Sequence, residues 1–239
     1  MCVITICRSK RETEENLRAM EEANKDGTGV IFYKNGMPFY KKNIDIKEVL
    51  ELNKTLKFPY AFHFRFTTVG QNKLLTHPFE VTPDSELKPF GSAKTLLMHN
   101  GHWANWDDTL HRYCLNALED LPDGDWSDSR AMAFIAAKLG PNVLKTLTTQ
   151  KIAFFSEKEN IILLGNGWTK ENGIAYSNKT WSYRTKSYGY GTYVVGQGWR
   201  QQDFSQLEDR ESEKERRADS AEDDKRKLRA LQVGKDKVE

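Results

Sequence analysis

The first two residues of the chain, Met1-Cys2, place a thiol where it could act as an N-terminal nucleophile. If the initiator methionine is removed, Cys2 carries both a thiol and a free α-amine. A thiol is a good nucleophile only after it loses its proton, and an adjacent amine can take that proton directly or through one water. The α-amine titrates at about 7.7–8.0, so near neutral pH it is partly available as a base. One residue could therefore supply nucleophile and base, although some chains place a cysteine here by chance.

Three other stretches carry polar residues that could bind and polarise a substrate. The first covers residues 63–70, HFRFTTVG, and is followed by His77. The second covers residues 98–101, MHNG, and the third covers residues 127–129, SDS, at a predicted helix start. Each stretch alone also has a plain structural explanation, so only their combination with Cys2 is informative.

Taken together, these motifs resemble the class II glutamine amidotransferases. This N-terminal nucleophile group includes the glutaminase domains of glucosamine-6-phosphate synthase and amidophosphoribosyltransferase. The order of a cysteine, an Arg-x-small-Thr run, His-Asn-Gly and Ser-Asp matches that family over roughly residues 2–180. The resemblance implies an α+β fold, the four-layer αββα sandwich of the N-terminal nucleophile hydrolases, and a glutaminase activity.

The resemblance assigns substrate binding to Arg65, Thr68, His77 and Asp128. Glutamine presents an α-carboxylate, and the planar guanidinium of Arg65 has the paired donors that suit it. Thr68 and His77 match positions that assist this arginine in the family. Asp128 lies in the first turn of a predicted helix, where the helix dipole favours its anionic form, and it suits the α-ammonium. For Arg65 and Asp128 an ordinary ion pair or a helix cap stays open as the alternative.

The resemblance assigns Asn100 and Gly101 to stabilising the reaction intermediate rather than to binding the substrate. Attack of sulfur on an amide carbon puts negative charge on the oxygen, and the resemblance assigns the Asn100 side-chain amide and the Gly101 N–H to the oxyanion hole. Losing one such donor typically costs on the order of 100–1,000-fold in rate. A strand that ends in Asn-Gly is also a plain turn signal.

The histidines and cysteines invite a metal interpretation, which their spacing does not favour. His99, His102 and His111 precede Cys114, but this spacing matches no recognised ligand set. We therefore predict no metal and no cofactor, and we interpret His99 as a packing or hydrogen-bonding residue.

Two positions depart from the family pattern. Val3 follows the nucleophile where the family usually has glycine, and His102 and Trp103 are bulkier than the residues that usually follow Asn-Gly. Both differences leave room for a related amide substrate.

The composition is that of a globular chain with a sizeable core. The 239 residues are 38% hydrophobic and carry a net charge of +2, which argues against a protein built mainly to bind nucleic acid. Nothing resembles a signal peptide, and no apolar run is long enough to span a bilayer. Three scattered cysteines give no disulfide framework. We expect a cytoplasmic protein without a membrane segment.

The hydrophobic pattern predicts strands at both ends of the chain and helices between them. Within the first strand Cys2, Ile4 and Ile6 share one face, and Cys7 points to the other. Two packed sheets covered by helices are therefore expected. The predicted helices cover residues 8–25, 44–56, 106–119 and 127–139, with a helical extension at 144–147. The predicted strands cover residues 2–7, 30–33, 38–40, 60–66, 95–99, 151–155, 161–164 and 173–177.

The composition changes near the C-terminus. We expect a glutaminase domain over residues 1–200 and a charged tail over residues 201–239, either helical or disordered. The tail is a candidate docking element, although a solvated tail is the plainer interpretation.

These observations predict a glutaminase in which Cys2 attacks the glutamine side-chain amide. Ammonia leaves, and water hydrolyses the glutamyl thioester. The length leaves no room for a synthase domain, so we expect a separate synthase or ammonia-acceptor protein, or a stand-alone amidohydrolase. Two alternatives stay open: an amidohydrolase acting on another amide, such as a γ-glutamyl compound, and a catalytically silent binding module.

Overall fold

The computed structural model describes residues 2–67, 72–118, 120–182, 193–194 and 198–199. The chain divides into two compact units, Met1–Lys186 and Ser187–Glu239. In the second unit, the described strands β12 (Tyr193–Val194) and β13 (Gly198–Trp199) pair in antiparallel fashion. The predicted tail over residues 201–239 lies outside the described residues, and the boundary at residue 200 stays a prediction.

A large antiparallel sheet forms the base of the first unit. Among the described residues it has seven strands: β1 (Val3–Cys7), β2 (Thr28–Lys34), β3 (Met37–Ile44), β4 (Tyr60–Phe64), β6 (Phe90–Ser92), β10 (Thr169–Glu171) and β11 (Ile174–Tyr176). Their order is β10-β11-β1-β4-β2-β3-β6. The N-terminal strand β1 is thus internal, paired with β4 on one side and β11 on the other.

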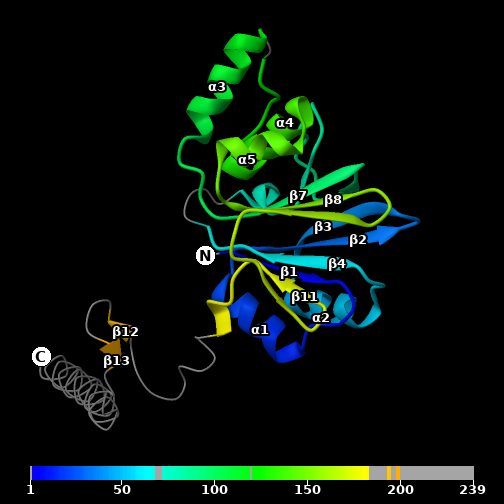
Figure 1. The fold of residues 1–239 in the computed structure, drawn as a ribbon. Helices are drawn as coiled ribbons and strands as arrows, with labels where there is room; N and C mark the ends of the chain where they lie inside the picture. Colours follow the sequence, from blue (N-terminus) through cyan, green and yellow to red (C-terminus); the bar gives the residue numbers. More distant parts are fainter. Residues whose placement is uncertain (1, 68–71, 119, 183–192, 195–197, 200–239) are drawn as a thin grey trace, which may run out of the picture. The chain divides into compact units, whose positions relative to one another are not determined.

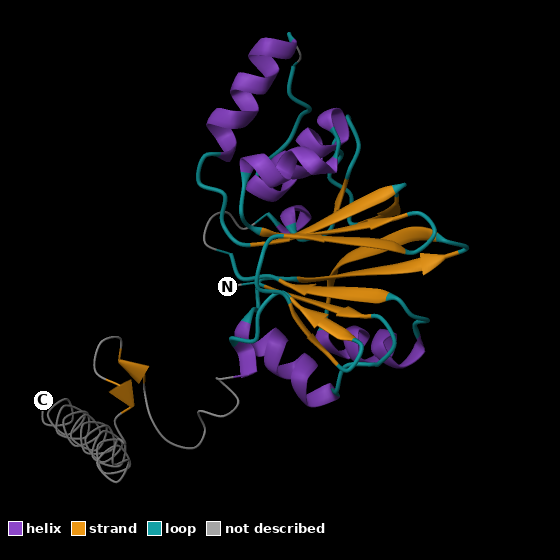
Figure 2. Cartoon of the chain, in the orientation of Figure 1, coloured by secondary structure: helices purple, strands orange, loops and turns teal. Residues whose placement is uncertain are grey.

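A smaller antiparallel sheet packs on the large one. Its described strands are β5 (Phe79–Glu80), β7 (Thr95–Asn100), β8 (Lys151–Ser156) and β9 (Asn160–Leu164), in the order β5-β7-β8-β9. Figure 2 shows the two sheets stacked face to face, with helices on both outer sides.

Helices cover the outer face of each sheet. They are α1 (Glu14–Ala23), α2 (Ile46–Thr55), α3 (Trp106–Ala117), α4 (Asp128–Leu139) and α5 (Leu144–Leu147), with 3₁₀ turns η1 (Lys73–Leu75) and η2 (Pro141–Val143). In Figure 1, α1 and α2 lie along the large sheet, and α4 and α5 lie over the small one. Side chains of Thr13, Asp45 and Ser127 cap α1, α2 and α4 by accepting a backbone N–H three residues later.

Three hydrophobic clusters hold these layers together. The cluster between the sheets includes Ile4 and Ile6 of β1, opposite Leu96 and Met98 of β7. The opposite face of β1 contributes Cys7 to a second cluster, which packs under α1 and α2. The third cluster joins α3 and α4 to the small sheet. Each fully buried aliphatic side chain contributes about 1.5–3 kcal/mol to folding, so β1 is anchored on both faces.

The predicted mixture of helices and strands is confirmed, with antiparallel sheets, as is the alternation of faces along β1. The predicted helix over residues 8–25 begins only at Glu14, because Thr13 provides the cap. The sequence pattern does not predict β5, β6 and β10, because two or three residues are too few for an alternating pattern. Within the described part of the chain, no helix is both long and apolar enough to cross a membrane.

Gly29 of the large sheet packs closely against the loop before β5. A Cβ added at Gly29 of β2 would overlap the backbone carbonyl of His77. We expect Gly29→Ala to lower the free energy of unfolding by about 1–3 kcal/mol, because this overlap moves backbone. Urea denaturation measures the change. In the control Gly91→Ala the added Cβ meets only side-chain atoms of Glu80 and Tyr40, so the loss is smaller. Equal losses in both variants would contradict the prediction.

Candidate active site

A pocket of about 490 Å³ brings most of the predicted site residues together. Its lining includes Cys2, Arg65, His77, Gly101 and Asp128, which come from four separate parts of the chain. Thr68, the remaining predicted substrate-binding residue, lies outside the described residues.

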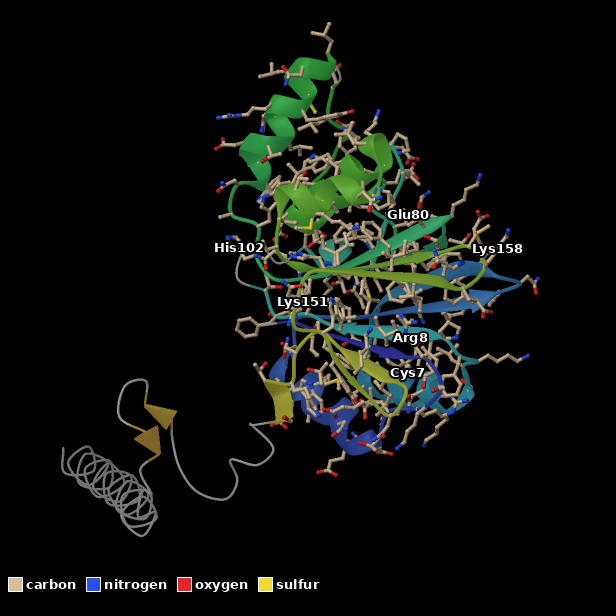
Figure 3. The ribbon with its side chains drawn as sticks, viewed as in Figure 1. Cys7, Arg8, Glu80, His102, Lys151 and Lys158 are labelled. Carbon is tan, nitrogen blue, oxygen red and sulfur yellow. The ribbon has the colours of Figure 1, made fainter. Side chains whose placement is uncertain are left out.

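Elements of both sheets and one helix position these residues. Arg65 directly follows β4, Gly101 directly follows β7, and Asp128 is the first residue of α4. Figure 3 shows His102, which also lines the pocket, and Lys151 of β8 at one end of the sheets, with Lys158 at the other end. The pocket therefore opens where β4 and β7 end.

Cys2 lies at the start of β1, beside the segment that follows β4. Its Sγ accepts the Phe66 N–H at 3.3 Å and lies 3.4 Å from the Phe66 carbonyl oxygen. Burial raises the pKa of the thiol, and the Phe66 hydrogen bond and the Arg65 charge only partly offset this. The thiol is thus protonated at neutral pH, and a base is needed to activate it.

Arg65 is nearly buried, at 8% exposure, and lines the pocket. Its backbone is fixed by hydrogen bonds with Gly27 and Asp26, and its Nη1 donates to the Asn72 carbonyl at 3.0 Å. It makes no salt bridge with another described residue. Asp26 is near enough to interact with its charge, but no described carboxylate lies within salt-bridge distance, so a buried guanidinium here can bind an anionic ligand.

Asp128 is held by the backbone on two sides. Its Oδ1 accepts the Ser129 N–H at 2.7 Å, and its Oδ2 accepts the Trp103 N–H at 3.1 Å. Ser127 provides the side-chain cap of α4, as predicted, which leaves Asp128 free of that task. Its side chain is 18% exposed and reaches the pocket, where it can receive a cation.

Three buried histidines form a cluster behind the pocket. The rings of His63 and His77 lie 4.0 Å apart, and those of His77 and His99 lie 6.3 Å apart. Burial lowers the pKa of all three, that of His63 to about 3, so the cluster is neutral at physiological pH. Neither ring nitrogen of His77 has a hydrogen-bond partner among the described residues, and this residue lines the pocket.

Gly101 is among the residues that line the pocket, whereas Asn100 is not. Gly101 lines it with φ +150°, a conformation that favours glycine, and an added Cβ would also require the end of the Gln150 side chain to move. Asn100 is buried at the end of β7, and its Nδ2 lies 2.7 Å from Ser177 Oγ.

Two groups of residues near the pocket lie outside the sequence motifs and were not predicted. Ser177 and Asn178 contact Asn100, Ile4 and Cys2 after β11. Arg130 is buried and donates to the carbonyls of Ser85, Asp123 and Asp125, which fixes the loop that forms part of the pocket wall. The one sequence signal for Arg130 is its place directly before the apolar run 131–137 of α4.

The described residues offer no group of three or more His, Cys, Asp or Glu side chains arranged to hold a metal ion. His99, interpreted from the sequence as a packing or hydrogen-bonding residue, is buried with its Nδ1 2.9 Å from Ser129 Oγ.

Comparison with solved structures reveals a distant likeness in fold. The allosteric regulatory enzyme of purine biosynthesis aligns with a TM-score of 0.52 at 16% sequence identity. The alignment covers 74% of this chain and 41% of that one, so the chain spans less than half the length of that enzyme. No protein-family model and no curated protein matches the sequence.

The neutral histidine cluster predicts a pH-dependent stability. The unfolded chain binds protons on these imidazoles below about pH 6.5, whereas the folded chain does not, so stability falls as pH falls. We expect His77→Gln to make this fall shallower by up to about 1.4 kcal/mol per pH unit between pH 6 and pH 5. Urea unfolding at several pH values measures the slope. The exposed His111→Gln is the control, and identical slopes in both variants would refute the prediction.

Proposed function

We propose that the protein is a glutaminase-type amidotransferase of the N-terminal nucleophile class. In this proposal the two sheets and their outer helices are the αββα sandwich of that class. One observation carries the proposal: Cys2, Arg65, His77, Gly101 and Asp128 line one pocket. The likeness in fold adds support, because the solved neighbour is a glutamine amidotransferase of the N-terminal nucleophile type.

The charges around the pocket suit a free amino acid. Arg65, without a carboxylate partner among the described residues, would bind the α-carboxylate, and Asp128 would bind the α-ammonium. His77 is neutral, and its ring nitrogens have no partner among the described residues, so it can add one hydrogen bond to the substrate without adding charge. Thr68 is proposed to assist Arg65.

The proposed reaction begins after Met1 has been removed. The α-amine of Cys2 takes the thiol proton, and the sulfur attacks the side-chain carbonyl carbon of glutamine. The Asn100 amide and the Gly101 N–H stabilise the oxyanion. The C–N bond breaks as the α-amine returns its proton to the leaving nitrogen, which gives ammonia and a glutamyl thioester. Water, activated by the same amine, then releases glutamate and restores the thiol.

The ammonia that is released would need an acceptor. We propose that a separate synthase or ammonia-acceptor protein receives it. A solitary amidohydrolase is the other version, and ammonia release that does not depend on any added protein distinguishes it.

The size of the pocket favours a second substrate class. About 490 Å³ falls within the range of pockets for drug-sized ligands, which exceed a free amino acid in size, and Trp106 and Trp126 extend its lining. A γ-glutamyl compound with a larger leaving group is therefore the alternative substrate, and the release of aniline from γ-glutamyl anilide tests it.

Replacement of the nucleophile tests the proposal. We expect Cys2→Ala to reduce ammonia release from glutamine to background, because no other group can form the thioester. The matched control is Cys114→Ala, which removes a buried thiol outside the pocket lining. Intact-mass analysis should show a wild-type chain that begins at Cys2. Equal ammonia release from wild type and Cys2→Ala, or an active enzyme that retains Met1, would reject the mechanism.

Replacement of the carboxylate-binding group tests the binding mode. We expect Arg65→Lys to raise KM for glutamine at least about tenfold, because an ammonium loses the bidentate contact with a carboxylate. Initial-rate kinetics measure the change, with the exposed helical variant Arg18→Lys as the control. An unchanged KM would show that the carboxylate binds elsewhere.

A further inference from the structure

Two residues after β11 connect the N-terminal strand with the end of β7. Ser177 Oγ accepts the Ile4 N–H at 2.8 Å and lies 2.7 Å from the side-chain nitrogen of Asn100. Asn178 donates from its Nδ2 to the Cys2 carbonyl at 2.6 Å. One short segment thus holds both the backbone of the proposed nucleophile and the side chain of the proposed oxyanion donor.

The segment itself is held rigidly. Ser177 is fully buried, and its backbone N–H donates to the Ile4 carbonyl at 2.9 Å. The Lys151 ammonium donates to the Ser177 carbonyl from the neighbouring sheet. The hydroxyl of Ser177 therefore has a fixed position from which to orient a neighbour.

The hydrogen bonds around this hydroxyl indicate how it orients Asn100. With Nδ2 of Asn100 as the donor, Ser177 Oγ accepts two hydrogen bonds and its own hydrogen has no acceptor among the described residues. Asn100 Oδ1 is then buried without a partner, which is costly. Turning the carboxamide over about its Cβ–Cγ bond gives the Ser177 hydrogen an acceptor, because Ser177 O–H then donates to Oδ1. The Asn100 nitrogen is then the buried atom that has no partner among the described residues.

We infer that Ser177 is a positioning residue that fixes the amide of Asn100 with its nitrogen free to donate. The relay runs from the Ile4 N–H to Ser177 Oγ and from the Ser177 hydroxyl to Asn100 Oδ1. It leaves both N–H bonds of Asn100 available to a developing oxyanion, whereas the opposite orientation presents a carbonyl oxygen that repels one. The inference rests on the proposed glutaminase function and assigns Ser177 a role within it.

Kinetics of Ser177 variants test this role. We expect Ser177→Ala to lower kcat about 10- to 100-fold and to leave KM within about twofold, because the groups that bind the substrate are untouched. Ser177→Thr, which keeps the hydroxyl, should restore most of kcat; if that chain does not fold, Ser177→Cys supplies a weaker donor and an intermediate kcat. The control is Thr5→Val on β1, whose buried hydroxyl has no partner among the described residues. A kcat for Ser177→Ala equal to that of Thr5→Val overturns the inference.

Neutron diffraction from a crystal of the wild-type protein tests the relay without any assay. A deuteron on Ser177 Oγ directed at Asn100 Oδ1 supports the inference, and an Asn100 nitrogen donating to Ser177 overturns it. Together with the ammonia assay, this result separates the hypothesis about Ser177 from the glutaminase hypothesis. A wild-type protein that releases no ammonia, either alone or with an added ammonia-acceptor protein, would reject the glutaminase function, whereas a reversed amide in an active enzyme would reject only the role of Ser177.

Discussion

The pairing of the N-terminal strand inside the large sheet is the constraint on which the rest of the site depends. β1 lies between β4 and β11, and both of its faces are buried, one against the small sheet and one against α1 and α2. Because the strand cannot shift by one residue without reversing its faces, its first residue has a fixed position. The thiol of Cys2 is therefore placed by the core of the molecule rather than by a surface loop.

Near Cys2, the pocket combines charged side chains with uncharged histidine side chains. Arg65 supplies a cation and Asp128 an anion, and each is tied to backbone groups that hold its orientation. The histidines behind them stay uncharged because burial disfavours their protonated forms. A ligand with both a carboxylate and an ammonium would thus meet Arg65 and Asp128, with Asp125 as a further carboxylate in the pocket lining.

Much of this arrangement could be predicted from the sequence, because it depends on local patterns. Alternating residues in β1 and the serine before α4 gave the correct faces and the correct cap. Short motifs also identified most of the pocket residues, although their roles stay predictions. The contacts of Ser177 with Ile4 and Asn100 could not be predicted. They join residues that are 173 and 77 positions apart, and the sequence around Ser177 has no distinctive motif. The packing of His63 on His77 is likewise set by the tertiary fold.

The pairing of β1 with β11 also has a consequence for biosynthesis. A ribosome makes the chain from its amino end, so the earliest residues leave the exit tunnel long before residues 174–178 exist. Until those residues emerge, β1 lacks one neighbouring strand and the Cys2 carbonyl lacks its Asn178 donor. Strand β1 is therefore made well before β11, and its pairing is completed only when β11 emerges.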